Sequence, residues 1–423
     1  MLTLTDIRAN RDEIEKALTK RGLEAGDTLD QILAEDEKRR ATQAELDNTL
    51  AESNSLSKEI GNLYKQGKRD EAEVMKSRTG ELKERSQELK DQQANIEEAL
   101  TQLLYQLPNS PDELVPAGLT ENDNEVVNEL GDKPNLHEGA APHWDLADKY
   151  DLIDFDLGSK VSGAGFPFYK GKGARLQRAL IQFFLDEANE AGYTEYIPPF
   201  VVNEASGIGT GQLPDKEGQM YHATADDLYL IPTAEVPLTN IFRDVILKEA
   251  ELPQKLCGYS PCFRREAGSY GKDVRGLNRL HQFEKVEIVQ VVHPDNSAAI
   301  LDEMVAHVVG LLKKLELPFR TLRLCGGDLS FASAITYDME VWSAAQERWL
   351  EVSSISNFKT FQTNRLKCRY KGGDGKTHLA HTLNGSALAL PRIVAALLEN
   401  NQDENGIKVP AVLHKYTGFD RID

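Results

Sequence analysis

Charged side chains that could clamp phosphate and amine groups are concentrated in one segment, from Phe263 to Glu287. Its sequence reads FRREAGSYGKDVRGLNRLHQFEKVE, a glycine-containing stretch of arginines and glutamates between two apolar flanks. A guanidinium group can bind phosphate through two parallel hydrogen bonds, and a carboxylate can accept from an ammonium or an exocyclic amine. The pattern predicts a strand, a long loop and a returning strand, although a solvated charged hairpin would carry the same charges. Its arginines, lysines and glutamates are Arg264, Arg265, Glu266, Lys272, Arg275, Arg279, Glu284, Lys285 and Glu287.

No other pattern of nucleophiles or metal ligands competes with this segment. The stretch GGDGKT at residues 372–377 ends like a phosphate-binding loop, but Tyr370 stands where the first glycine is required. The 9 histidines show no HExxH spacing, and the 4 cysteines form no CxxC pair. A zinc hydrolase and a disulfide framework are therefore not expected, and free cysteines suit a reducing compartment.

The composition indicates several domains and no membrane anchor. The chain has 423 residues, long enough for two or three domains, and a net charge of −19. Its beginning, MLTLTDIRANRDE, carries carboxylates where a signal peptide needs basic and then apolar residues. We expect a soluble cytoplasmic protein with no membrane and no DNA partner. The excess of negative charge opposes binding of nucleic acid over a wide surface, although it leaves room for a local contact.

Residues from about 30 to 104 are expected to form an arm of two long antiparallel helices. They lack proline, and apolar residues recur every seven positions at Met75, Leu82, Leu89, Ile96 and Leu103. The break at residues 64–69 is short, and Asp70 with Glu73 resembles a helix cap. Each helix has one narrow apolar seam, so the hairpin should project as a coiled coil.

This arm has two readings. Heptad repeats most often form a structural spacer or a dimerising coiled coil. Basic residues at the tip favour the alternative, an arm that binds the phosphates of a nucleic acid. The tip residues are Lys58, Lys65, Lys68 and Arg69.

The remainder of the chain predicts an α+β domain after a linker. Segment 108–150 is acidic and rich in proline, so we divide the chain into 1–107, a linker leading into the catalytic domain at 108–150, and the catalytic domain at 151–423. In that domain we expect a mainly antiparallel sheet flanked by helices. The expected helices are 174–191, 298–315 and 387–398, and the expected strands are 196–202, 286–292 and 319–324.

The order of motifs resembles the class II aminoacyl-tRNA synthetases, and in detail the bacterial seryl-tRNA synthetases. Residues 174–203 match motif 1, residues 263–287 match motif 2, and residues 385–398 match motif 3, with Gly385, Ala387 and Arg392 in its pattern. The stretches GTGQLP, TAEVPLTN and EVSSISN match serine-specific signatures. The resemblance covers nearly the whole chain, including the arm. It departs at Arg265 and Phe358, where smaller residues are frequent.

The resemblance implies a role for each matching residue. Arg264 corresponds to the arginine at the ATP α-phosphate, Arg392 to that at the γ-phosphate, and Arg279 binds the serine carboxylate; these three are the expected catalytic residues. Implied ATP-binding residues are Arg264, Arg265, Glu266, Phe283, Glu351, Val352, Ser353, Ser354 and Arg392, with Mg²⁺ held by Glu351 and Ser354. Implied serine-binding residues are Thr233, Ala234, Glu235, Arg264, Glu287, Asn384 and Ser386.

The resemblance also implies a reaction and partners. Serine and ATP would give seryl-adenylate, and the seryl group would pass to tRNA(Ser), whose long variable arm meets the hairpin tip of a homodimer. Whether tRNA(Sec) is also charged stays open. Two other functions compete with this one. A non-catalytic scaffold that only holds a nucleotide should lack at least one catalytic residue, and an enzyme that aminoacylates a carrier protein should lack the arm.

Overall fold

The computed structural model describes residues 1–266 and 275–423, which form two compact units. The arm unit comprises Leu2–Thr19 and Leu23–Pro108, and the core unit comprises Met1, Lys20–Gly22 and Asn109–Asp423. The expected tip of the motif 2 loop, including Lys272, lies outside the described residues. None of the described helices combines the length and apolar character that crossing a lipid bilayer requires.

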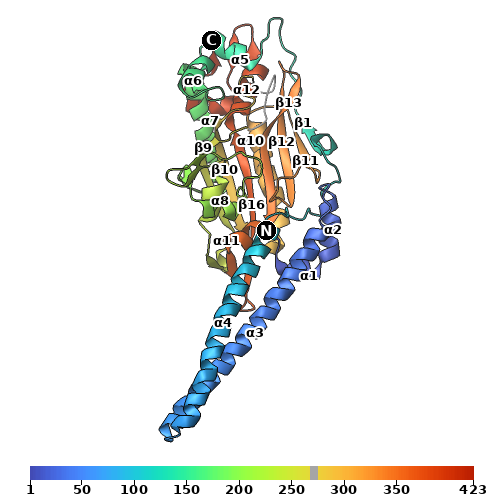
Figure 1. Cartoon of the computed structure of the whole chain (residues 1–423). Coiled ribbons are helices and arrows are strands. Elements are labelled where there is room, and N and C mark those ends of the chain that lie inside the picture. Colours follow the sequence, from blue (N-terminus) through green and yellow to red (C-terminus); the bar gives the residue numbers. More distant parts are fainter. Residues whose placement is uncertain (267–274) are drawn as a thin grey trace. The chain divides into compact units, whose positions relative to one another are not determined.

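The arm unit is a long helical hairpin preceded by two short helices (Figure 1). The short helices are α1 (Leu4–Ala9) and α2 (Arg11–Thr19), and the hairpin consists of α3 (Gly26–Lys65) and α4 (Arg69–Leu104). Its seam buries Leu82, Leu89 and Ile96, so the seven-residue period predicted the correct face. The predicted coiled-coil arm is thus confirmed, with its first helix starting slightly earlier than expected.

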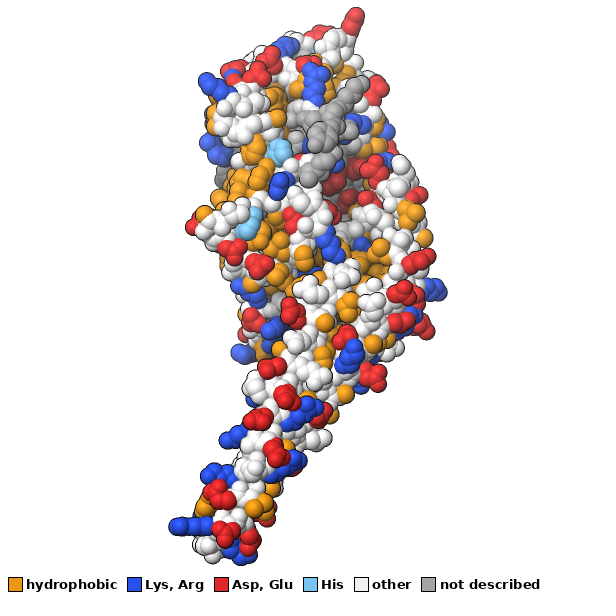
Figure 2. Space-filling model, in the orientation of Figure 1, with side chains coloured by type: hydrophobic (Ala, Val, Ile, Leu, Met, Phe, Trp, Pro, Cys, Tyr) orange, Lys and Arg blue, Asp and Glu red, His pale blue; other side chains and the backbone are white. Residues whose placement is uncertain are grey.

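The tip of the hairpin differs from the prediction in its cap. Helix α4 follows Lys68, and no side chain caps its first turn, so Asp70 lies inside the helix. All four predicted tip cations are exposed. Lys68 pairs with Glu71 at 3.2 Å, and acidic and basic side chains alternate along the hairpin (Figure 2). Exposed pairs of this kind add little stability, so the tip charges remain available to a partner.

The core unit is built on an eight-stranded sheet in the order β1-β11-β12-β13-β16-β10-β9-β4. All neighbours are antiparallel except β4 and β9, which confirms the predicted mainly antiparallel α+β domain. The strands are β1 (Glu125–Leu130), β4 (Thr194–Glu195), β9 (Gln254–Phe263), β10 (Gln282–Val292), β11 (Phe319–Arg323), β12 (Ile335–Ser343), β13 (Arg348–Lys359) and β16 (His381–Ala389).

Three amphipathic helices cover this sheet: α7 (Gly171–Glu190), α10 (Ser297–Lys314) and α12 (Leu390–Asn400). Each buries an apolar face, represented by Phe183, Leu312 and Ile393, in the main hydrophobic cluster. Burying a side chain of this size contributes about 1.5–3 kcal/mol, so these faces fix the helices on the sheet.

Shorter elements surround the sheet. The remaining α-helices are α5 (His143–Lys149), α6 (Phe155–Val161), α8 (Glu204–Thr210), α9 (Glu235–Asn240), α11 (Phe361–Leu366) and α13 (His414–Thr417). Small sheets are formed by β2 (Ile153–Asp154) with β3 (Phe168–Tyr169), by β5 (Val201–Val202), β6 (His222–Ala223) and β7 (Leu228–Leu230), by β8 (Ile246–Lys248), β14 (Arg369–Lys371) and β15 (Thr377–Leu379), and by β17 (Gln402–Asp403), β18 (Gly406–Lys408) and β19 (Arg421–Ile422).

Three local predictions differ from the structure. Segment 108–150 contains β1 and α5 in addition to loops, because an edge strand with one free side tolerates polar residues. Of the strand predicted at 196–202, only Val201–Val202 forms one (β5), since the prolines at 198 and 199 cannot donate ladder hydrogen bonds; the short strand β4 ends just before the predicted range. The helix predicted from 387 starts at Leu390, because residues 387–389 continue β16 and the following proline favours a helix start.

Candidate active site

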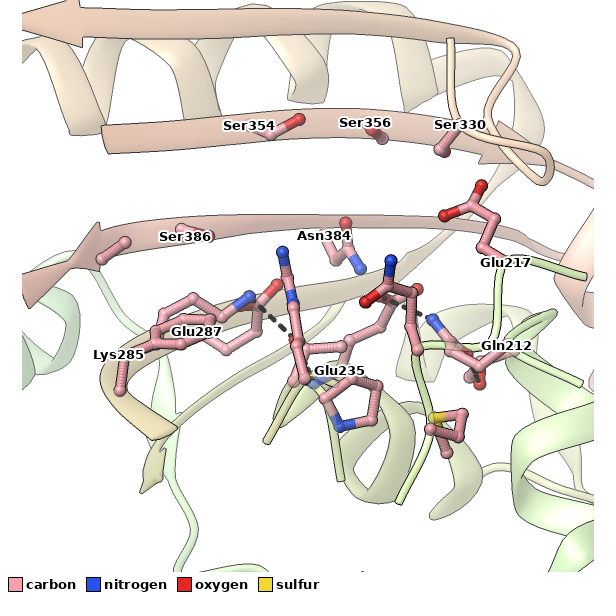
Figure 3. Close-up of a pocket in the computed structure, with 18 of the residues that line it drawn as sticks. Gln212, Glu217, Glu235, Lys285, Glu287, Ser330, Ser354, Ser356, Asn384 and Ser386 are labelled. Atoms are coloured by element: carbon pink, nitrogen blue, oxygen red, sulfur yellow. Dashed lines mark hydrogen bonds and ion pairs between the residues drawn. The ribbon is translucent and has the colours of Figure 1, made fainter. Parts of the chain in front are cut away.

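A cavity of about 570 Å³ lies at the central strands of the sheet. Figure 3 shows polar side chains from β10, β13 and β16, from the first residue of α9 and from the segment after α8, around one space. The structure brings most of the predicted site residues into its lining: Thr233, Glu235, Arg264, Glu266, Arg279, Phe283, Glu287, Glu351, Val352, Ser353, Ser354, Asn384, Ser386 and Arg392.

Strand register explains this convergence. Side chains two residues apart on a strand share a face, so Lys285 and Glu287 on β10 point the same way. Glu287 lies opposite Ser386 on β16, and Asn384 lies opposite Ser356 on β13. Residues that are far apart in the sequence therefore meet on one face of three adjacent strands.

Two predicted residues lie outside this lining. The Arg265 side chain is exposed, and its backbone N–H donates to the Gln219 carbonyl at 3.0 Å. Ala234 is fully buried against Leu238 and Val289. In the structure, neither side chain meets the cavity.

One buried polar part of the cavity is an acidic floor, formed by Glu235, Glu287, Lys285 and Thr233. The Lys285 ammonium lies 2.5 Å from a Glu287 carboxylate oxygen and donates to the Thr233 hydroxyl at 2.8 Å. Glu235 is only 7% exposed. Burial, followed by the charge of Glu287, raises the pKa of Glu235 to about 7. With both carboxylates ionised and one ammonium present, the floor holds one negative charge in excess, which suits a monocationic ligand group.

Guanidinium groups and an aromatic ring form another part of the cavity. The Arg264 guanidinium lies over the Phe283 ring, 5.2 Å from its centroid, within cation–π range. Arg279 donates to the Glu266 carboxylate at 2.9 Å. Glu266 has a left-handed backbone at φ 48°, uncommon for a residue with a side chain. This part of the lining can therefore accept anionic groups and a flat ring.

Arg392 and Glu351 lie at the edge formed by β13 and α12. Arg392 donates to the Glu351 carbonyl at 2.7 Å and to the Asn278 carbonyl at 3.1 Å. Its guanidinium lies 3.8 Å from the Glu351 carboxylate. Two backbone carbonyls thus hold the Arg392 guanidinium beside the Glu351 carboxylate. The guanidinium can bind a phosphate, and the carboxylate can bind the metal ion that accompanies the phosphate.

Two segments of the chain match known families. Residues 1–111 match "Seryl-tRNA synthetase N-terminal domain", and residues 220–401 match "tRNA synthetase class II core domain (G, H, P, S and T)". The chain is 52% identical over 424 residues to a serine-tRNA ligase of Salinibacter ruber, covering 100% of this chain and 99% of that protein. The chain belongs to the seryl-tRNA synthetase family. The resemblance predicted from motif order is therefore confirmed.

Solved structures of the seryl-tRNA synthetase family have the same fold. The crystal structure of seryl-tRNA synthetase from Pyrococcus horikoshii complexed with ATP has a TM-score of 0.91 and 35% identity, covering 100% of this chain and 99% of that one. The cytoplasmic serine-tRNA ligase from Naegleria fowleri in complex with AMP has a TM-score of 0.86 and 26% identity, covering 98% of this chain and 96% of that one.

Sequence reasoning missed two buried ionisable residues of this family member. The motif 2 pattern assigns no role to Lys285, although its ammonium neutralises part of the acidic floor. Asp338 on β12 lies opposite Ser354, and burial, followed by the Glu351 charge, raises its pKa well above the usual range. Its Oδ1 atom has no hydrogen-bond partner in the described part of the chain. An aspartate within the apolar strand ITYDMEVW was the available signal.

Proposed function

We propose that this cavity activates L-serine with ATP and transfers the seryl group to tRNA(Ser). The observation that carries the proposal is the pairing of an acidic floor, suited to an ammonium, with arginines suited to phosphates in the same cavity. The first step joins a serine carboxylate oxygen to the α-phosphorus and releases diphosphate. In the second step, a terminal ribose hydroxyl of the tRNA attacks the seryl carbonyl, and AMP leaves.

The arginines supply charge stabilisation in this proposal. Arg264 binds the α-phosphate, where negative charge is redistributed during the in-line attack, and Arg392 binds the γ-phosphate. Arg279 orients the serine carboxylate as it attacks, and Phe283 stacks on the adenine. No protein nucleophile is required, because positioning two reactants alone can contribute about 7–11 kcal/mol.

The acidic floor selects the amino acid. The serine ammonium replaces the missing positive charge beside Glu287 and Glu235, while Thr233, Asn384 and Ser386 offer hydrogen bonds to the hydroxyl. A site that hydrogen-bonds a hydroxyl can reject the analogue without it by about 10⁴- to 10⁵-fold, since buried polar groups are left unpaired. Alanine is excluded in this way, and threonine is excluded by size.

Magnesium is assigned to Glu351 and Ser354. Carboxylate and hydroxyl oxygens are hard ligands of the kind that Mg²⁺ prefers, so these two side chains would hold the ion beside the phosphates. No group of three or more His, Cys, Asp or Glu side chains forms a metal cluster among the described residues, which fits an ion that arrives with its nucleotide. The ion supplies charge neutralisation for the phosphates.

The partners and location follow from the surfaces. The exposed tip residues Lys58, Lys65, Lys68 and Arg69 contact tRNA phosphates. Apolar side chains of the motif 1 segment are exposed, including Ile197 at 90% and Val201 at 42%, and they pack against a second copy in a homodimer. The enzyme acts in the cytoplasm, where its free cysteines stay reduced.

The proposal is tested by exchange of labelled diphosphate into ATP, followed by charging of total tRNA. We expect exchange that depends on serine, and seryl-tRNA as the product. Exchange without charging would leave the activation step intact but contradict the tRNA assignment. Absence of any serine-dependent exchange would overturn the function.

A further inference from the structure

Gln362 on α11 lies behind the wall of the cavity, in contact with its acidic floor. The residue is 1% exposed and does not line the cavity itself. Its side-chain N–H group donates to the Glu235 carboxylate at 2.6 Å and to the Thr210 carbonyl at 3.0 Å. Its side-chain oxygen accepts from the Thr382 hydroxyl at 2.7 Å.

Only one orientation of this amide satisfies its neighbours. If the amide were flipped, its oxygen would face the Thr210 carbonyl and the Glu235 carboxylate, which in its ionised form has no proton to donate. The Thr210 carbonyl, which can only accept, sets this orientation, and the Thr382 hydroxyl then donates to the amide oxygen. The chain of hydrogen bonds from Thr382 through Gln362 to Glu235 therefore has a direction.

Glu235 needs hydrogen-bond donors because burial and the nearby Glu287 charge disfavour its ionised form. Its pKa of about 7 in the folded protein reflects burial and the Glu287 charge. Among the described residues, the charged groups that act on it are Glu287 and Lys285, both from β10, whereas α11, β16 and the segment after α8 present amides. Figure 3 shows one of these, Gln212, directed at Glu235. Amides stabilise the carboxylate and leave the excess charge uncancelled.

We propose that Gln362 is a positioning residue for serine: it holds Glu235 in the orientation and the ionised state that the substrate ammonium and hydroxyl require. The inference rests on the proposed function of the cavity. Gln362 acts only through Glu235, so its effect falls on serine and not on ATP. It also sets the pH range in which serine binds.

The test compares Gln362→Met with Gln290→Met. Gln290 is another fully buried glutamine, on β10, and donates to the Tyr193 hydroxyl at 2.8 Å away from the cavity. The same change of side chain there controls for the loss of a buried amide. Serine KM, ATP KM and their pH profiles are measured by diphosphate exchange. Thr382→Val, which keeps shape and removes the hydroxyl, is the second variant.

In Gln362→Met we expect serine KM to rise about tenfold or more, because a hydrogen bond to a charged group is lost. ATP KM should stay within about twofold of the original, and the midpoint of the serine pH profile should move upward by about one unit. Thr382→Val should move both serine values in the same direction by less, and Gln290→Met should move neither.

Two results would overturn the inference. One is an unchanged serine KM and pH midpoint in Gln362→Met or, if that variant does not fold, in Thr382→Val. The other is an equal rise of the KM values for serine and ATP, which indicates a general structural role. If the unmodified enzyme shows no serine-dependent exchange, the proposed function itself fails, and that outcome is recognised before any variant is compared.

Discussion

Replacing Glu235 by glutamine should weaken the use of serine and flatten its dependence on pH. The substitution keeps the size of the side chain and removes the excess negative charge of the acidic floor. Hydrogen bonds to charged groups contribute about 1.5–3 kcal/mol, so kcat/KM for serine should fall by about 10- to 150-fold. ATP KM should change little, because Glu235 belongs to the serine end of the cavity.

The sign of the pH effect follows from the raised pKa of Glu235, about 7. Below that pH the carboxyl is protonated, so the serine ammonium must displace a proton in order to bind. In the unmodified enzyme, kcat/KM for serine should therefore rise as the pH increases through about 7. One unit below the midpoint it should be about tenfold lower than its plateau.

The assay is diphosphate exchange at saturating ATP across the neutral range. A matched control is Glu284→Gln, because Glu284 lies on the opposite face of β10 and accepts from Gln177 at 2.9 Å. That variant should keep the original midpoint, whereas Glu235→Gln should show no inflection near neutral pH. A flat profile for the unmodified enzyme, or an inflection retained in Glu235→Gln, would refute the reasoning.

Three further outcomes are expected. Arg264→Ala should lose about 3 kcal/mol of transition-state stabilisation, read as a drop in the rate of diphosphate exchange; an unchanged rate would remove Arg264 from the phosphate site. Charge reversal of the exposed tip residues Lys65, Lys68 and Arg69 should reduce tRNA charging while exchange is preserved, with reversal of the exposed Lys83 as the control; equal loss of both activities would contradict a separate tRNA contact. Alanine should be activated about 10⁴-fold less efficiently than serine, and activation within about tenfold would contradict a hydroxyl-binding pocket.

The periodicity of apolar residues predicted the helical arm because it depends only on which side chains share one face of a helix, and the order of motifs predicted the catalytic domain. Apolar residues seven apart can only form a narrow helical seam, and Leu82, Leu89 and Ile96 are buried there. Short apolar runs are harder to assign to a strand or a helix, because a sequence such as residues 387–389 suits both. The edge strand β1 lies in a polar segment whose composition predicts a linker. Its pairing with β11 identifies it as a strand, and this pairing is visible only in the structure.

Site residues that belong to a sequence motif could be predicted. Contacts between site residues that depend on how the elements pack were missed. Arg264, Glu287 and Arg392 could be named from motifs, and the structure brings all three to one cavity. The ion pair of Lys285 with Glu287 and the contact of Gln362 with Glu235 depend on distances between elements. A single sequence holds no information on such distances, so these partners emerged only from the fold.

A structure of the protein with a non-hydrolysable analogue of seryl-adenylate tests the central claim most directly. The account predicts that the ammonium of the analogue lies between Glu235 and Glu287, with Arg264 at the linkage that replaces the phosphate and the adenine on Phe283. An analogue bound elsewhere, or with its ammonium turned away from both carboxylates, would contradict it.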